Sequence, residues 1–173
     1  MNEDIVYDKE KFKNVIHHII YKYKHEEIGR TILYHLLYFT DFNFYELYEK
    51  SLTGMKYINE RIIIPDQKKF DEAINELVKE GKIKEEKIIL IKNYDYYTYQ
   101  YTALMQPENT FNTKERNVIE ENMLKLADMD STTISMYSHG DKPWRISKDG
   151  EEINYEAVFY RGDEYQIREY DED

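Results

Sequence analysis

The chain has 173 residues, with 24 basic and 35 acidic side chains and no cysteine. A domain of this length buries roughly 70% of its unfolded surface, so neither disulfides nor a structural metal is needed for a core. The absence of cysteine excludes a disulfide framework and any thiolate metal site, and it fits a reducing compartment. The net charge of −11 opposes binding to a phosphate backbone, which draws on Lys and Arg.

The start of the chain shows no targeting signal. Residues 2–4 are polar or acidic, and no apolar stretch follows them. No apolar run approaches the length that spans a bilayer. We therefore expect a cytoplasmic protein without a signal peptide, a transmembrane helix or a membrane partner.

Two features of the composition are uneven. Residues 149–173 hold ten acids against Arg161 and Arg168, a net charge of −8, which leaves only −3 for residues 1–148. The acidity therefore belongs to a C-terminal segment rather than to the whole surface. Tyrosine occurs 18 times against one tryptophan. A tyrosine ring with a wet hydroxyl suits an interface, but it equally suits the rim of a core.

Apolar spacing predicts the first two helices. Between residues 12 and 23, apolar side chains recur at steps of three and four and form one stripe. From about residue 29 to 48, apolar side chains cover nearly the whole circumference, which is typical of a helix buried on several sides. We expect this second helix at the centre of the domain. Turn residues at 51–54 end it.

Strand and helix signals alternate in the middle of the chain. Residues 55–64 predict a short extended piece, and Pro65-Asp66 predicts the start of a third helix that Gly81 ends. Residues 82–91 and 96–104 are rich in β-formers and are joined by Asn93-Tyr94-Asp95, which predicts a β-hairpin.

The last third of the chain predicts two more helices. Asn112 and Glu115 form a capping-box pattern before a fourth helix that runs to about residue 128. Asp130 or Ser131 starts a shorter fifth helix, which residues 141–143 break. We predict one α+β, mainly α domain over residues 1–173, with its core at about 10–160. About five helices surround a buried central helix, and there is one small β-hairpin.

A helix followed by a hairpin, at residues 70–104, outlines a winged helix. Such a domain places a basic helix in the major groove of DNA. The predicted third helix carries Lys68, Lys69 and Lys79 beside four acids. This mixed face argues against nucleic-acid binding.

Two groups of residues suggest chemistry but lack the required spacing. His17 and His18 are adjacent, so on a helix they point about 100° apart and cannot ligate one metal ion. Ser138, His139 and Asp141 are the residue types of a hydrolase triad, but they are too crowded in sequence to serve one. No Gly-x-Ser-x-Gly elbow and no glycine-rich phosphate loop is present. We expect no enzyme, no cofactor and no metal.

Three stretches together resemble one family. They are Leu-Leu-Tyr-Phe-Thr-Asp at 36–41, Leu-Thr-Gly-Met-Lys-Tyr at 52–57, and Ile-Ser-Met-Tyr-Ser-His at 134–139 with Asp141, Pro143 and Trp144 after it. In this order and spacing they are similar to the Panacea domain, also called the SocA-like antitoxin domain. One stretch departs from the family pattern, because Arg61-Ile62-Ile63-Ile64-Pro65 stands where a Gly-Pro-Val-Pro-like stretch is usual.

The resemblance implies a mainly helical domain that neutralises a cognate protein toxin by direct binding, in bacteria, phages or other mobile elements. It carries over no catalytic residue, and it leads us to expect structural roles for the motif residues. These are Tyr38, Asp41, Thr53, Gly54, Tyr57, Ser135, Ser138, His139, Asp141, Pro143 and Trp144.

The acidic segment suggests where a toxin binds. Many toxins act on nucleic acid through basic surfaces, which an acidic, tyrosine-bearing segment complements. The candidate toxin-binding residues are Glu164, Tyr165, Glu169, Tyr170 and Asp171. A merely solubilising role for this segment is an alternative. Two other functions stay open: an adaptor that delivers a toxin to a protease or unfoldase, and a winged-helix-like DNA-binding regulator.

Overall fold

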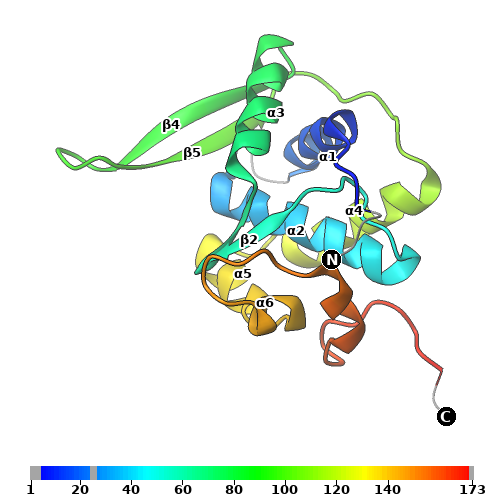
Figure 1. Ribbon diagram of the computed structural model, residues 1–173. Helices are drawn as coiled ribbons and strands as arrows, with labels where there is room; N and C mark the ends of the chain where they lie inside the picture. The colour runs from blue at the N-terminus through cyan, green and yellow to red at the C-terminus, as the bar shows by residue number, and fades with distance from the viewer. Residues whose placement is uncertain (1–4, 24–26, 172–173) are drawn as a thin grey trace.

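The computed structural model describes residues 5–23 and 27–171, so the acidic start of the chain and the last two residues of the acidic segment lie outside it. The described residues form an α+β, mainly helical structure with small sheets, as expected (Figure 1). Its elements are α1 (Lys9–Lys22), β1 (Ile28–Gly29), α2 (Arg30–Tyr48), β2 (Tyr57–Glu60), β3 (Ile62–Pro65), α3 (Gln67–Lys79), β4 (Ile83–Ile91), β5 (Tyr96–Ala103), α4 (Thr113–Leu126), α5 (Ser131–Ser138), α6 (Lys142–Ile146) and the 3-10 helix η1 (Tyr155–Tyr160).

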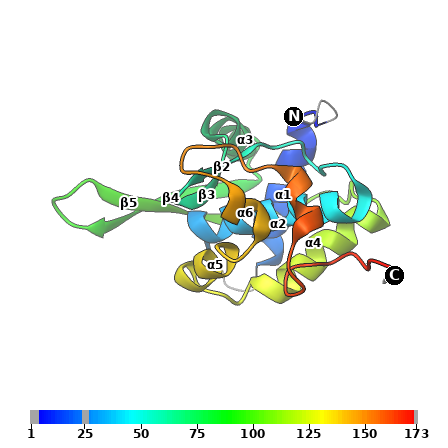
Figure 2. The ribbon, with the colours of Figure 1, turned by 60° about the horizontal axis from the view of Figure 1, so that its bottom comes forward.

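Helix α2 is buried on most of its sides. Thirteen of its 19 residues are buried, and it packs against α1, α4, α5, β3 and η1. Figures 1 and 2 show it running through the body, with α1, α4 and α5 beside it. Despite its apolar surface, neither this helix nor any other in the described ranges is long and apolar enough to cross a membrane.

Local capping signals fix the ends of the other long helices. Asp8 caps α1 and Asp66 caps α3, each accepting a hydrogen bond from a backbone N–H of the first turn. Helix α3 ends at Gly81, whose φ is +71° and whose N–H donates to the carbonyl of Val78 at 3.0 Å. The N–H of Lys82 donates to the carbonyl of Leu77, which completes a Schellman motif. The predicted capping box at Asn112 and Glu115 is present in α4.

The sheets are more extensive than the sequence indicates. Strands β4 and β5 form the predicted hairpin, but β1 pairs with β5 as well, so the order is β1-β5-β4. The extended piece predicted at 55–64 is a second hairpin, in which Tyr57 pairs with Pro65 and Glu60 with Ile62. Arg61 makes this tight reversal with a φ of +68°. The stretch that departs from the family pattern is therefore strand β3 and its turn.

The region after α5 differs from the prediction in one respect. Residues 141–143 do end α5, but they also start the short helix α6. Pro143 is tolerated there because the first turn of a helix leaves its N–H groups without intrahelical partners. Residues 155–160, which the sequence does not type, form η1 against α2 and α6.

His35 on α2 makes the stability depend on pH. It is fully buried, and its Nδ1–H donates to the carbonyl of Thr31 at 2.7 Å. Burial lowers the pKa of His35 to about 4. The unfolded chain binds a proton near pH 6.5, so the stability that neutral His35 contributes is fully present above that pH and is lost as the pH falls towards 4.

We expect the free energy of unfolding, measured by urea denaturation, to fall by about 2 kcal/mol between pH 7.5 and pH 5 because of His35. Burial also lowers the pKa values of His17 and His18, so these add to the loss in the same direction. The variant His35→Leu should have a correspondingly flatter pH profile. An unchanged slope in this variant would contradict the prediction.

Candidate functional site

Asp41 joins the first two family motifs. It is fully buried on α2 and accepts hydrogen bonds from the Thr53 N–H (2.8 Å), the Thr53 hydroxyl (2.6 Å), the Tyr57 hydroxyl (2.7 Å) and the Ser51 hydroxyl (3.1 Å). Burial raises the pKa of the Asp41 carboxyl, and the hydrogen bonds from Thr53 and Tyr57 oppose that rise. This carboxylate therefore anchors the 51–57 turn on α2.

Asp141 joins the first motif to the third and to the C-terminal region. Its carboxylate receives two hydrogen bonds from Arg161, Nε to Oδ1 at 2.8 Å and Nη2 to Oδ2 at 2.9 Å, and a third from the Tyr38 hydroxyl at 2.8 Å. Both charged side chains are completely buried. Arg161 Nη1 also donates to Asn43 and Glu46 on α2. We call Asp141, Arg161 and Glu46 the buried charge cluster.

Ser138, His139 and Asp141 each have a separate partner. The Ser138 hydroxyl donates to the Ser135 carbonyl at 2.7 Å, while Asp141 is held by Arg161 and Tyr38. The ring of His139 stacks on Trp144 at 4.6 Å, and its Nε2 lies 3.1 Å from the Arg61 carbonyl. The three side chains are therefore not arranged as a nucleophile, a base and an orienting acid.

The remaining motif residues shape the backbone. Gly54 has a φ of +74°, and a Cβ there would collide with the carbonyl of Val6. The neighbouring carbonyl of Thr53 accepts the Asp8 N–H at 2.8 Å, which ties the N-terminal stretch to this turn. Pro143 is buried in the first turn of α6.

The acidic segment is attached to the helical body through Glu46. This fully buried carboxylate accepts hydrogen bonds from the backbone N–H groups of Ile167 (3.2 Å) and Arg168 (3.4 Å) and from the Tyr170 hydroxyl (2.8 Å). The Tyr165 hydroxyl donates to the carbonyl of Tyr137 at 2.8 Å. Of the five candidate toxin-binding residues, these two tyrosines are therefore bonded to the body.

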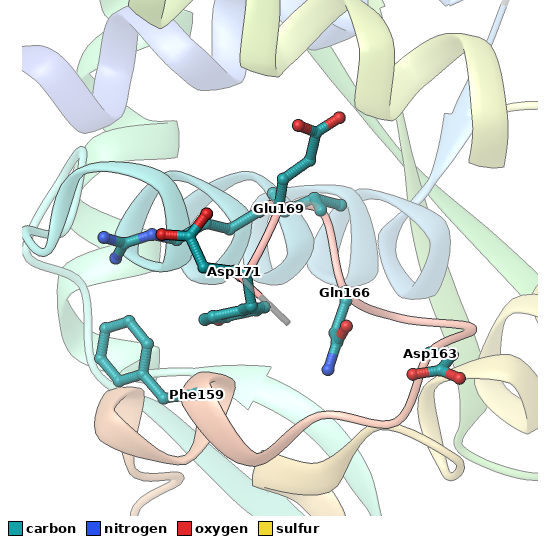
Figure 3. A pocket seen from close by; sticks show the side chains of 8 residues that line it. Phe159, Asp163, Gln166, Glu169 and Asp171 are labelled. Carbon is teal, nitrogen blue, oxygen red and sulfur yellow. The ribbon is translucent and has the colours of Figure 1, made fainter. Parts of the chain in front are cut away.

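The three acidic candidates lie on the outside. Glu164, Glu169 and Asp171 are exposed. Glu169 and Asp171 border an open pocket of about 620 Å³, together with Asp163, Gln166 and Phe159 (Figure 3). Phe159 lies at one end of it and Asp163 at the other, with Gln166 between them (Figure 3). The border of this open pocket therefore carries three carboxylates against one guanidinium, that of Arg168.

The paired histidines have structural surroundings. His17 Nε2 lies 2.9 Å from the Met105 carbonyl, and the ring of His18 meets Phe111 edge-on at 5.6 Å. Across residues 5–23 and 27–171, no group of three or more His, Asp or Glu side chains is placed to hold a metal ion.

Sequence reasoning missed Glu46, Asn43 and Arg161. They take part in the same network as the motif residues Tyr38 and Asp141, but they belong to none of the three stretches that carry the resemblance. One signal was available. Glu46 is a charged residue within a helix whose other sides are mostly apolar, and such a residue requires a buried partner.

Comparison with known families identifies the family of this chain. Residues 33–145 match the antitoxin SocA-like, Panacea domain, a range that contains all three motifs together with Asp41 and Asp141. The chain therefore belongs to the SocA-like Panacea antitoxin family, which indicates a role of the toxin–antitoxin type. No curated protein and no solved structure matches the chain. Arg161 and the acidic segment lie beyond the matched range.

Proposed function

We propose that this protein is the antitoxin of a toxin–antitoxin pair, and that it neutralises a cognate protein toxin in the cytoplasm by binding it, without catalysing a reaction. The family match over residues 33–145 carries this proposal. The internal bonding of the motif residues supports it. Asp41, Asp141, Ser138 and His139 have partners within the chain, so the surface is left to bind the toxin.

The acidic segment is the proposed contact surface. Glu164, Glu169 and Asp171 are exposed, whereas Tyr165 and Tyr170, which lie between them in the sequence, bond to the body. Carboxylates held in place lose less conformational freedom on binding than those of a free tail. They also attract a basic surface during the encounter and so raise the association rate.

Deletion of the whole segment does not test this idea. Truncation before Asp149 removes Arg161 and leaves Asp141 and Glu46 buried without their cation. Loss of neutralisation would then reflect unfolding as readily as loss of contact. Charge reversal at exposed positions should leave the fold intact, because surface substitutions usually change stability little.

The triple variant Glu164→Lys, Glu169→Lys, Asp171→Lys should associate at least about tenfold more slowly with its toxin at low salt, and the difference should shrink at high salt. The measurement is the association rate with the purified product of the adjacent reading frame, at two salt concentrations. The control is Glu60→Lys, Glu108→Lys, Glu121→Lys, which changes three exposed acids elsewhere by the same charge. Equal rates for both triples would contradict a specific contact and leave a solubilising role.

Toxin levels separate direct inhibition from proteolytic delivery. Co-expression with the adjacent reading frame should restore growth while the amount of toxin stays unchanged. A toxin half-life that falls only in the presence of this protein would indicate an adaptor. Failure of the wild-type chain to restore growth would refute the proposed function with that partner.

A further inference from the structure

The hairpin of β4 and β5 extends away from the body as an arm (Figures 1 and 2). We call residues 87–97 the arm tip. Six large apolar or aromatic side chains of the arm tip are exposed, with exposed fractions from 44% for Tyr97 to 73% for Tyr94. The others are Ile89, Leu90, Ile91 and Tyr96. Monomeric surfaces rarely gather apolar residues in this way unless they bind something.

The arm tip has no role in the core. Ile83 and Tyr101 at the base of the hairpin are buried and belong to the hydrophobic core, whereas none of the six exposed side chains of the arm tip does. Their exposure is therefore not a by-product of folding the body.

Two tyrosines of the arm, Tyr97 and Tyr99, are held by contacts within the chain. Tyr97 and Tyr99 project from the same face of β5 and meet edge to face at 5.6 Å. Lys87 lies 3.9 Å from the ring centre of Tyr97, and Arg30 lies 4.3 Å from that of Tyr99. Side chains fixed in this way lose little entropy on binding, and tyrosine is frequent among the residues that dominate interfaces.

The charge of the arm tip differs from that of the rest of the chain. It holds Lys87 and Lys92 against Asp95, a net charge of +1 in a chain of −11. Closer to the body, Glu85 and Glu86 are paired with Arg30 and Lys84. The arm tip therefore suits an apolar groove with an acidic rim, whereas the acidic segment suits a basic surface.

The edge of the hairpin disfavours a second copy as the occupant. β4 is an edge strand, but its register shifts between Ile89 and Ile91, and Lys84 and Lys87 lie along it. Bulges and lysines are the features that keep sheet edges from pairing with another strand. Two chains of −11 also repel each other. Two lysines beside an aspartate are too few to draw the arm tip onto nucleic acid.

We infer that the arm tip is a second toxin-binding surface, which inserts its exposed aliphatic and tyrosine side chains into an apolar, acid-rimmed groove of the toxin. This inference rests on the proposed function. The acidic segment and the arm tip then hold two different patches of one partner, the first through charge and the second through apolar burial. Binding at the arm tip should accordingly depend little on salt.

The test is the double variant Leu90→Ser, Tyr94→Ser, at two exposed positions outside the core. Its affinity for the purified product of the adjacent reading frame should fall at least about tenfold, equally at low and high salt, with an unchanged melting temperature. The matched control is Leu124→Ser, Met136→Ser, which removes two exposed apolar side chains from α4 and α5 and should bind within about twofold of wild type.

A second variant with conservative changes tests whether the apolar surface itself, rather than any change at these positions, determines affinity. The variant Leu90→Met, Tyr94→Phe keeps the apolar surface and should bind like the wild type. Wild-type affinity in the serine variant would overturn the inference while leaving the proposed function standing. The inference would also be overturned if the control pair lost as much affinity. It would likewise be overturned if the serine variant only abolished a dimer of the free protein. A wild-type chain that fails to bind would refute the proposed function itself.

Discussion

Replacing Arg161 with methionine is expected to lower the free energy of unfolding by about 3–5 kcal/mol, because it leaves Asp141 and Glu46 as buried charges without their cation. Arg161 makes four hydrogen bonds to α2 and Asp141, all between 2.8 and 3.0 Å, and its side chain is completely buried. Methionine replaces the unbranched aliphatic stem of Arg161, so we expect most of the cost to arise from the two carboxylates left without their cation. Urea denaturation at neutral pH measures it.

Arg168→Met is the matched control. Arg168 also reaches Glu46 and Glu49, but its side chain is 38% exposed and its contacts with them are 3.4 Å or longer. We expect this change to cost less than about 1 kcal/mol, as for a surface ion pair. Similar losses for Arg161→Met and Arg168→Met would show that the buried charge cluster does not stabilise the fold.

The importance of Arg161 changes how the acidic segment is understood. The sequence presents residues 149–173 as an appendage distinguished by charge, and the family match ends at residue 145. Yet Arg161 completes the network of Tyr38 and Asp141, and Glu46 bonds to both Arg161 and Tyr170. The first part of this segment therefore belongs to the folded body, and its outer carboxylates are presented by that body.

Elements with local signals could be predicted from the sequence. Their signals lie within a few residues of the element concerned. Examples are the apolar stripe of α1, the all-round burial of α2 and the caps at Asp66, Gly81 and Asn112. Strand β1 could not be found in this way, because two residues carry no periodicity and their partners lie at 100–101. The β2–β3 reversal was also hidden, because Arg61 rather than a glycine takes the positive φ.

The difference between local signals and long-range contacts also applies to the candidate site. The motif residues were recognised through family resemblance, whereas Arg161 pairs with Asn43 and Glu46 across more than 100 positions, which no local pattern reveals. The arm illustrates another limit. Its β-forming residues predict a hairpin, but strand propensity does not distinguish a buried hairpin from one that extends into solvent.

Asp41→Ala is expected to destabilise the chain by about 3–5 kcal/mol, because the loss of this carboxylate leaves several buried donors without an acceptor. The Thr53 N–H and the hydroxyls of Thr53 and Tyr57 point at Asp41 from the second family motif. The 51–57 turn would then lose its attachment to α2, and with it the tight approach of Gly54 to Val6. Denaturation in urea measures the free energy of unfolding.

Asp41→Asn should fall between the alanine variant and the wild type. The amide fills the same volume and keeps one oxygen as an acceptor, but its NH₂ group faces donors that need an acceptor. Thr40→Ser serves as a control on the same helix, since it keeps the hydroxyl that donates to the Leu36 carbonyl and should lose about 1 kcal/mol. If Asp41→Ala cost no more than Thr40→Ser, the turn would be held by packing alone. If stability instead rises from the alanine variant to the asparagine variant to the wild type, the hydrogen bonds that Asp41 accepts are what hold the first two motifs together.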